Sequence, residues 1–344
     1  MSCYVIAEAG VNHNGSEEMA FQLVEEAVES GADAVKFQTF KAESLVQKGA
    51  EKAEYQKTTT GDGDQYEMLK KLELSDEAHT RLADYCKTKG IEFLSTGFDE
   101  ASIDMLLELG MQRLKVPSGE LTNKPYIEFV AQKNRPIILS TGMADLDEVN
   151  EAITWVKACR DTHGFSAPLQ EILTILHCTS NYPAPLDSVN LRAMQTMADE
   201  FGLPVGYSDH TAGILIAPVA VAMGATVIEK HFTLDKQLPG PDHQASLEPH
   251  ELAQMIKDIR AVERSLGNGA KAPTEEELQV RQVVRRSIVL AKDVKKGDVI
   301  TREHLTLLRP EGGIHPKYIN DVIGKRFVRD LETDYLLQWS DITH

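Results

Sequence analysis

The chain has 344 residues, of which 42% are hydrophobic and 26% are charged, and its formal net charge is −17 at pH 7. This length suits one large domain followed by a small one. The acidic balance argues against a nucleic-acid partner or an anionic membrane surface, although local lysines still allow an anionic substrate.

Cysteine usage and the N-terminus predict a cytoplasmic protein. No spacing typical of a disulfide framework or a zinc site links the four cysteines, Cys3, Cys86, Cys159 and Cys178. Reduced thiols are the simplest account of them. The opening sequence MSCYVIAEAG lacks the basic region of a signal peptide. The longest uncharged run, 212–228, is interrupted by Pro218 and Gly224, so a buried helix followed by a buried strand explains it better than a membrane span.

The first part of the chain alternates between apolar, strand-like runs and segments with helical periodicity. Strands are predicted at Tyr4–Ala9, Ala34–Gln38, Ile91–Thr96, Arg113–Pro117, Pro136–Thr141, Ile172–Cys178, Pro204–Ser208 and Thr226–His231. Helices are predicted at Glu17–Glu29, Ala78–Lys89, Ala101–Leu109, Leu146–Cys159, Leu191–Glu200 and Glu251–Leu266. Eight strand-then-helix units indicate an α/β protein with a TIM (β/α)8 barrel. A doubly wound open sheet is the alternative, but it would concentrate its site at one switch point, whereas all eight strands end in polar residues.

Three segments depart from this alternation. The connection 40–74 is too long for an ordinary loop, and we expect it to cross the barrel mouth with some helix near Gln65–Lys71. We assign residues 1–266 to the barrel and residues 267–285, with Gly, Pro and an acidic run, to a linker. Residues 286–344 form a small, mostly β domain near the lower size limit for independent stability, so we expect it to lean on the barrel or on a partner chain.

Histidines stand at the end of one predicted strand and just after the end of another. PVGYSDH closes on His210, and TVIEKHF contains His231. Because neighbouring strands lie about 4.8 Å apart, the two imidazoles are predicted to share one divalent metal ion. Nitrogen donors completed by water or substrate oxygen suit Mn²⁺ or Mg²⁺ as readily as Zn²⁺. His13 and His177 are either further members of the site or structural residues.

Two lysines, Lys36 and Lys115, lie inside strands that otherwise look buried. An unpaired buried ammonium is costly. We therefore expect these lysines either to pair with Glu8 or Glu229, or to bind a dianion at the barrel mouth. The neighbouring PSG and STG sequences offer hydroxyls and close backbone amides, which suit phosphate oxygens. A Schiff-base lysine would look the same, so an aldolase stays an alternative.

The order of the motifs resembles one known family. AEAGVNHNG, AVKFQTF, LKVPSGE, ILSTGM, HCTSNYPAP, GYSDHT, EKHFTLD and PGPDHQASLEP are together similar to the sialic acid synthase family. The last part of the chain resembles the antifreeze-like (SAF, β-clip) domain that ends these enzymes. The resemblance implies a metal-dependent synthase that condenses phosphoenolpyruvate with an N-acetylated mannosamine-type sugar and releases phosphate by C–O cleavage. It also implies a domain-swapped homodimer in which the antifreeze-like domain covers the partner's active site.

The resemblance also implies roles for single residues. His210 and His231 match metal ligands, with Mn²⁺ expected and Mg²⁺ or Co²⁺ as alternatives. Phosphoenolpyruvate is expected at Lys36, Lys115, Ser118, Ser140 and Ser180, although many relatives have Asn at position 180. The sugar or the metal is expected to face Glu8, Gln38, Tyr182, Ser208, Glu229 and Asp242. Arg309, in LLRPEGG, matches an antifreeze-domain arginine that holds the sugar's N-acetyl group in the partner subunit; a surface arginine in a turn is the alternative.

The catalytic residues are expected to be Glu8, Glu229, Lys36 and Lys115, and the sequence does not decide which carboxylate activates water. N-acetylmannosamine, which gives N-acetylneuraminate, is the first expectation for the sugar. The alternative is 2,4-diacetamido-2,4,6-trideoxymannose, which would make the enzyme an N,N'-diacetyllegionaminate synthase. A Schiff-base aldolase without a metal and a non-enzymatic ice-binding or interaction protein are more remote alternatives.

Overall fold

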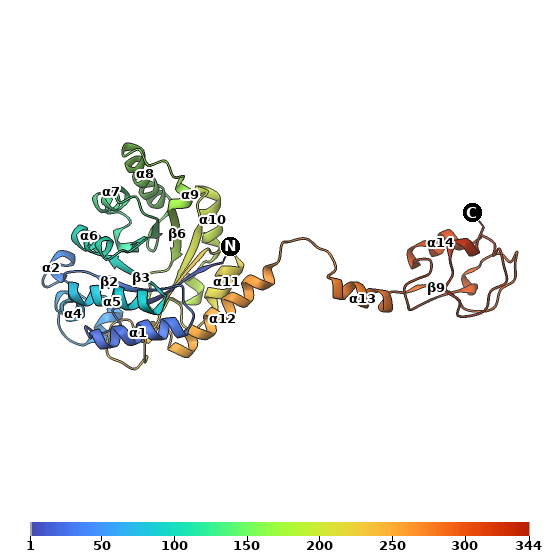
Figure 1. Cartoon of the computed structure of the whole chain (residues 1–344), viewed down its shortest axis with the longest axis horizontal. Coiled ribbons are helices and arrows are strands. Elements are labelled where there is room, and N and C mark those ends of the chain that lie inside the picture. The colour runs from blue at the N-terminus through green and yellow to red at the C-terminus, as the bar shows by residue number, and fades with distance from the viewer. Residues whose placement is uncertain (1, 344) are drawn as a thin grey trace. The chain divides into compact units, whose positions relative to one another are not determined.

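The computed structural model of this chain describes residues 2–343, except for the side chains at positions 55 and 58. The chain divides into two compact units, of which the first ends at Gly267 and the second begins at Asn268 (Figure 1). Positions 1 and 344, the outer bounds of the two predicted domains, lie outside the described residues. Among the residues that are described, none of the helices combines the length and the apolar character that a membrane span requires.

The first unit is built on eight strands, which are β1 (Tyr4–Gly10), β2 (Ala34–Thr39), β3 (Glu92–Gly97), β4 (Leu114–Val116), β5 (Ile137–Ser140), β6 (Leu173–Cys178), β7 (Val205–Asp209) and β8 (Val227–His231). Their order in the sheet is β3-β2-β1-β8-β7-β6-β5-β4, and the paired strands run parallel. The two end strands of this order, β3 and β4, also contact each other, so the sheet closes on itself. The predicted TIM barrel is confirmed, and the open doubly wound sheet is excluded.

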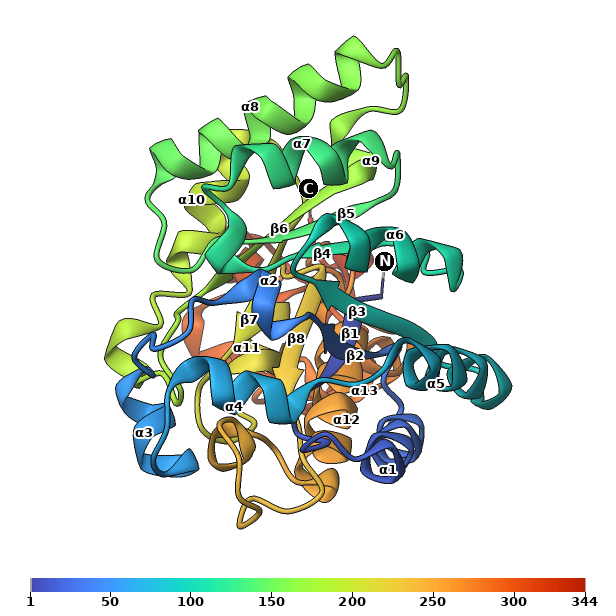
Figure 2. The same cartoon turned by 90° about the vertical axis from the view of Figure 1, so that its left-hand side faces the viewer.

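Helices surround these strands, as Figure 2 shows. They are α1 (Glu17–Glu29), α5 (Asp76–Lys89), α6 (Glu100–Glu108), α7 (Lys124–Gln132), α8 (Leu146–Thr162), the short α9 (Leu169–Ile172), α10 (Arg192–Phe201), α11 (Ile216–Ala222) and α12 (Pro249–Leu266). Their ends follow local signals in the sequence. Ser16 caps α1 by accepting a hydrogen bond from Met19 N, and Asp145 forms a capping box with Glu148 at the start of α8. Gly202 closes α10 in the left-handed conformation that a helix end favours.

The long connection after β2 folds into α2 (Ala42–Leu45), α3 (Glu54–Thr60) and α4 (Gln65–Leu72). The helix predicted near Gln65–Lys71 is therefore confirmed. A small apolar cluster of Val11, Phe40, Met68 and Leu72, with Phe98 packed against it, holds this connection. Val11, Phe40 and Phe98 follow the carboxyl ends of β1, β2 and β3, so the connection lies at the mouth of the barrel, as the sequence predicts.

The second unit contains α13 (Glu275–Val284), an antiparallel pair of β9 (Ser287–Leu290) and β10 (Leu305–Leu308), and the short α14 (Ile319–Val322). It has its own apolar core, in which Ile288, Leu305 and Phe327 are buried. Helix α13 falls inside the range 267–285 that the sequence assigns to a linker. Thr274 and Glu277 form a capping box at its start, so the acidic run in TEEE is the first turn of a helix.

Successive side chains of β7 and β8 point to opposite faces of the barrel wall. On the face that packs against helices, Asp209 and Lys230 form an ion pair with an Oδ2–Nζ distance of 2.9 Å, and both side chains are completely buried. The ammonium of Lys230 also donates to the carbonyl oxygen of Thr211, and Asp209 Oδ1 accepts from the hydroxyl and backbone N–H of Thr211. This network joins the ends of the two strands that carry the predicted metal ligands.

We expect Lys230→Met to lower the free energy of unfolding by about 3–5 kcal/mol, because it leaves the buried Asp209 carboxylate without a partner. Chemical denaturation measured by circular dichroism would give this value. The matched control is Lys124→Met, since Lys124 pairs with Glu128 on an exposed helix face, where such a pair contributes about 0.5 kcal/mol or less. Equal effects of the two substitutions would contradict the structural role of the buried pair.

Candidate active site

The carboxyl ends of the barrel strands enclose a cavity of about 260 Å³. It is lined by most of the residues that the sequence predicts for the site, namely Glu8, Lys36, Gln38, Lys115, Ser118, Ser140, Ser180, Tyr182, Ser208, His210, Glu229 and His231. The active sites of TIM barrels lie at this end of the strands. Asp242 and Arg309 do not line the cavity. Five side chains that also line it had no role predicted from the sequence, and these are Thr96, Phe98, Pro117, Met143 and Cys178.

Lys36 lies between the two buried glutamates of the cavity. Its Nζ atom is 2.8 Å from Glu8 Oε2 and 3.6 Å from Glu229 Oε2, and it donates to Thr96 Oγ1 at 2.9 Å. Burial lowers the pKa of Lys36, but Glu229 and Glu8 outweigh this effect and raise the pKa above its usual value. Lys36 is therefore a protonated ammonium, whereas a Schiff base requires the free amine.

Lys115 also contacts Glu229, one of the two glutamates beside Lys36. Its Nζ atom is 3.4 Å from Glu229 Oε1 and donates to Ser140 Oγ at 2.7 Å. Burial lowers the pKa of Lys115, against the attraction of Glu229. The sequence left ion pairing and substrate binding as alternatives for the two lysines, and the structure shows that they are paired and also line the cavity.

The two glutamates respond differently to the same burial. Burial raises the pKa of Glu8 to about 7. It would raise the pKa of Glu229 as well, but Lys115 and Lys36 outweigh it and hold this pKa at about 2. Two carboxyl groups with separated pKa values can divide acid–base and electrostatic roles between them. Near neutral pH, Glu229 stays ionised while Glu8 can gain or lose a proton.

The predicted histidine pair meets at the ends of β7 and β8, with ring centroids 5.6 Å apart. His210 Nδ1 donates to the carbonyl oxygen of Thr179 at 2.7 Å, so Nε2 carries the lone pair of the ring; this Nε2 lies 3.5 Å from Ser208 Oγ. His231 Nδ1 is buried and has no hydrogen-bond partner in the described part of the chain. Burial lowers the pKa of His210 and lowers that of His231 well below the usual value, so both rings are neutral.

These histidines fit a metal ion that keeps open positions. Two neutral rings at this separation can each place a nitrogen about 2.1 Å from one ion. Within residues 2–343, no group of three or more His, Cys, Asp and Glu side chains is arranged to hold a metal. The protein would thus supply two nitrogens, and water and substrate oxygens would fill the remaining positions, as Mn²⁺ accepts. Tyr182 packs against both rings, with centroid distances of 4.1 Å to His210 and 5.6 Å to His231.

Three small side chains converge around Gly142, in the loop after β5. Ser118 Oγ lies 3.2 Å from Cys178 Sγ and accepts a hydrogen bond from Gly142 N at 3.0 Å. A Cβ atom at Gly142 would lie 2.8 Å from Ser118 Oγ, 2.6 Å from Cys178 Sγ and closer still to Ser180 Oγ. Glycine at this position therefore keeps open a small polar hollow, and Cys178, for which the sequence predicts only a reduced thiol, forms one of its walls.

Comparison with known proteins identifies the family. The sequence profile of the NeuB family matches residues 23–271, and that of the SAF domain matches residues 285–343. The chain belongs to the NeuB family. Its SAF domain confirms the predicted antifreeze-like domain, and the resemblance to the sialic acid synthases is confirmed with it.

Individual relatives of this NeuB-family chain cover almost its whole length. It is 56% identical to the N,N'-diacetyllegionaminic acid synthase of Legionella pneumophila, over 99% of this chain and 95% of the relative. It is 49% identical to the Campylobacter jejuni protein of the same name, over 97% of this chain and 98% of the relative. The crystal structure of an N-acetylneuraminic acid synthetase from Leptospira borgpetersenii matches with a TM-score of 0.69 at 32% identity, over 83% of this chain and 93% of that one. The chain is therefore an enzyme, a sugar-acid synthase, and the aldolase and non-enzymatic alternatives lose their basis.

Two predicted substrate residues lie outside the cavity of this NeuB-family enzyme. Asp242 is in the loop after β8 and is only 8% exposed. Burial raises its pKa to about 6, and no hydrogen bond to its carboxylate is present among the described residues. Arg309 follows β10 in the second unit and is exposed. Its predicted contact with a partner subunit stays a prediction.

The roles of His13 and His177, which the sequence left open, can be judged from their contacts. Neither lines the cavity. His13 is buried, and its Nδ1 accepts a hydrogen bond from Gly15 N at 3.0 Å. His177 Nε2 donates to the carbonyl oxygen of Val189 at 2.7 Å. Both histidines therefore hydrogen-bond to loops near the site, and neither contributes to the cavity wall.

Because Ser118 and Ser180 are expected to bind phosphoenolpyruvate, Gly142→Ala should weaken that binding roughly tenfold or more. The added methyl group would displace the three side chains of the hollow. Isothermal titration calorimetry with phosphoenolpyruvate would measure the change. Gly119→Ala is the matched control, because Gly119 lines the same cavity but a Cβ there would meet no atom within 4 Å. Similar losses in both variants would show that the hollow at Gly142 has no special role.

Proposed function

We propose that this chain is an N,N'-diacetyllegionaminate synthase, which condenses phosphoenolpyruvate with 2,4-diacetamido-2,4,6-trideoxymannose. The observation that carries this proposal is the 56% identity with the Legionella pneumophila enzyme, against 32% with the Leptospira borgpetersenii sialic acid synthetase. N-acetylmannosamine, the first expectation from the sequence, becomes the second choice.

The reaction forms one C–C bond and breaks one C–O bond. C3 of phosphoenolpyruvate attacks the aldehyde carbon of the open-chain sugar, and positive charge develops at C2. Water adds to C2 and loses a proton, which gives a tetrahedral intermediate. The bond between C2 and the phosphate oxygen then breaks, the C2 hydroxyl loses its proton, and a ketone and inorganic phosphate are released. Of the two protons of the added water, one ends on the former aldehyde oxygen and the other leaves with the phosphate. One water molecule is consumed in each turnover.

The lysines and the small side chains of the cavity would hold phosphoenolpyruvate. Lys36 and Lys115 bring two positive charges to the wall, and their two glutamate partners balance these charges while the cavity has no substrate. Ser118, Ser140 and Ser180 add hydroxyl donors for phosphate and carboxylate oxygens. Fixing phosphoenolpyruvate in one orientation beside the aldehyde supplies much of the rate.

His210 and His231 would hold the divalent metal, Mn²⁺ by preference. When bound, such an ion supplies Lewis-acid polarisation of the aldehyde oxygen. The neutral rings and the hydrogen bond from His210 Nδ1 to Thr179 support this role, because they leave nitrogen lone pairs for the ion.

The separated pKa values of the two glutamates suggest how they divide the remaining work. Glu8, whose pKa is about 7, would take the proton from the attacking water. The amide of Gln38 donates to its Oε1 at 3.4 Å. Glu229, which stays ionised, would stabilise the positive charge at C2.

A direct assay tests the reaction. We expect Mn²⁺-dependent release of phosphate from phosphoenolpyruvate with the diacetamido sugar, and much slower release with N-acetylmannosamine. EDTA should abolish the reaction, and added Mn²⁺ should restore it. Faster turnover of N-acetylmannosamine would overturn the assignment of the sugar, and undiminished release in EDTA would overturn the dependence on a metal.

We also propose a homodimer in which Arg309 reaches the sugar bound to the partner subunit. Arg309→Ala should then raise the KM for the sugar at least about tenfold and leave the KM for phosphoenolpyruvate within about twofold. Steady-state kinetics with each substrate varied in turn would measure both values. Arg285→Ala, at another exposed arginine of the second unit, should change neither. Equal effects of Arg309→Ala on the two KM values would argue against a contact with the sugar.

A further inference from the structure

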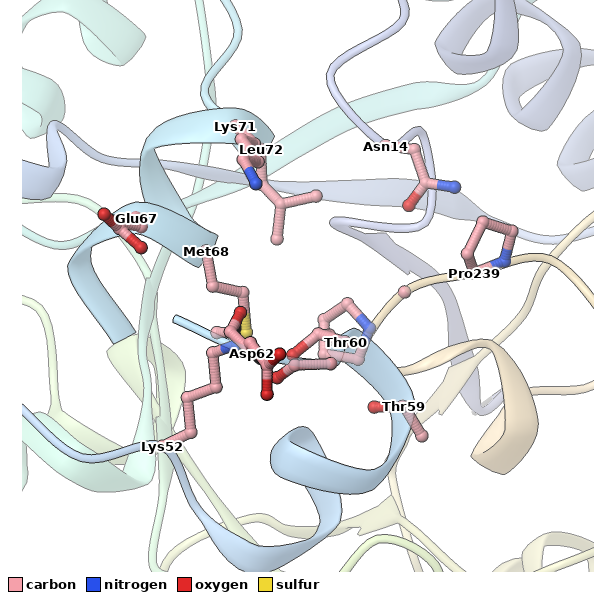
Figure 3. A pocket seen from close by; sticks show the side chains of 13 residues that line it. Asn14, Lys52, Thr59, Thr60, Asp62, Glu67, Met68, Lys71, Leu72 and Pro239 are labelled. Atoms are coloured by element: carbon pink, nitrogen blue, oxygen red, sulfur yellow. Dashed lines mark hydrogen bonds between the residues drawn. The ribbon is translucent and has the colours of Figure 1, made fainter. Parts of the chain in front are cut away.

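A second pocket, of about 440 Å³, lies at the mouth of the barrel, and we call it the outer pocket (Figure 3). Three loop segments form its walls. Asn14 comes from the loop after β1, and Pro239 to Pro241 come from the loop after β8. The long connection after β2 contributes Lys52, Thr59, Thr60, Gly61, Asp62, Glu67, Met68, Lys71 and Leu72. Its volume is that of a small-molecule site. None of the residues predicted for the site lines it.

The outer pocket is a neighbour of the catalytic cavity. Both have walls in the same apolar cluster, because Met68 and Leu72 line the outer pocket while Phe98, which packs against that cluster, lines the cavity. Pro241, in the outer pocket, is followed directly by Asp242, the buried carboxylate that has no hydrogen-bond partner among the described residues. The outer pocket is therefore placed to receive the far end of a sugar whose aldehyde end lies in the catalytic cavity.

The charges around the outer pocket favour a neutral ligand. Lys52 and Lys71 line it together with Asp62 and Glu67, so their formal charges cancel. Moreover, the ammonium of Lys52 is committed to the fold, since it donates to the carbonyl oxygens of Gly61 at 3.0 Å and Asp62 at 3.1 Å. A phosphate group on the far end of a sugar would meet two carboxylates and two lysines, of which Lys52 is already engaged by the backbone, so the pocket offers no net positive charge to hold it.

The other groups of the outer pocket match an acetamido substituent. Asn14 Oδ1 accepts a hydrogen bond from His243 Nε2 at 3.1 Å, which fixes the orientation of the amide. Asn14 Nδ2 has no protein partner in the described part of the chain and can donate to a carbonyl oxygen. Met68, Leu72 and Pro239 offer apolar contact for a methyl group. Figure 3 shows Asn14 and Pro239 on one side of the hollow and Leu72 and Met68 across from them.

We propose that the outer pocket binds the far end of the sugar and recognises its 4-acetamido group, with Asn14 Nδ2 as the donor to the acetamido carbonyl. This inference rests on the proposed function. N-acetylmannosamine has a hydroxyl group at C4 and would leave the amide of Asn14 without that contact. The outer pocket thereby selects neutral sugars that carry a second N-acyl group near the end remote from the aldehyde.

Asn14→Asp tests the proposal with almost no change in shape. The aspartate keeps an oxygen to accept from His243, and it tolerates the positive φ of 51° at this position. It loses the amide donor and adds a negative charge that repels the acetamido carbonyl. We expect kcat/KM for the diacetamido sugar to fall at least about tenfold, while kcat/KM for N-acetylmannosamine and the KM for phosphoenolpyruvate change less than about threefold.

The matched control is Asn134→Asp. Asn134 also has a positive φ, of 50°, and its Oδ1 also accepts a hydrogen bond, from Arg160, but it lies at the opposite end of the barrel, before β5. This variant should leave both sugars unaffected. A second variant, Thr60→Trp, fills the outer pocket from the end of α3 and should give the same selective loss as Asn14→Asp. Thermal unfolding would confirm that each variant is folded.

Equal losses with both sugars, or no loss with either, would overturn the role of the outer pocket while leaving the proposed function in place. The proposed function is tested separately by the unmodified enzyme. If that enzyme turns over N-acetylmannosamine and not the diacetamido sugar, both proposals fail before any variant is made.

Discussion

The structure depends on a balance of four charges that are almost completely removed from water. Lys36, Lys115, Glu8 and Glu229 are each no more than 5% exposed, and every one of them contacts a member of opposite sign. Burying one such ion alone would cost several kcal/mol. When Glu8 is ionised the four charges cancel, so the barrel can keep two ammonium groups at the place where we propose that the phosphate and carboxylate groups of the substrate bind. The arrival of a dianion would disturb this balance, so substrate binding and the ionisation of the glutamates are linked.

Contacts elsewhere in the barrel hold the strand ends in place and so keep the four charged side chains in contact. Glu229 and His231 face the cavity from β8, while Lys230 between them points toward the helices and pairs with Asp209 of β7. The buried pair on the outer face holds the two strands together where their inner faces carry the histidines. Alternate residues at the ends of β7 and β8 therefore have two roles. Those that face inward line the cavity, and those that face the helices form the buried ion pair.

Most of the barrel could be predicted from the sequence because its strands are apolar runs that end in polar residues, and the observed strands start and end within about two residues of the predicted ones. Residues within strands, such as Lys36 and His231, could be assigned to the site because a parallel barrel brings all strand ends to one face. Asp242 and the outer pocket could not be located in this way, since their positions follow from loop conformation. Gly142 and Cys178 could not be predicted either, because their roles depend on how closely the Gly142 backbone approaches neighbouring side chains. The spacing of apolar residues in a sequence carries no information about such a distance.

The alternation along β8 limits how this enzyme can change over time. Removing or adding one residue within the strand would turn Glu229 and His231 toward the helices and bring Lys230 into the cavity. Such a change would replace a negative charge of the cavity with a positive one and would separate His231 from His210. A change of chain length in the connections between strands and helices leaves this alternation intact, and such connections also line the outer pocket. The chemistry at the strand ends and the walls of the outer pocket can therefore change independently.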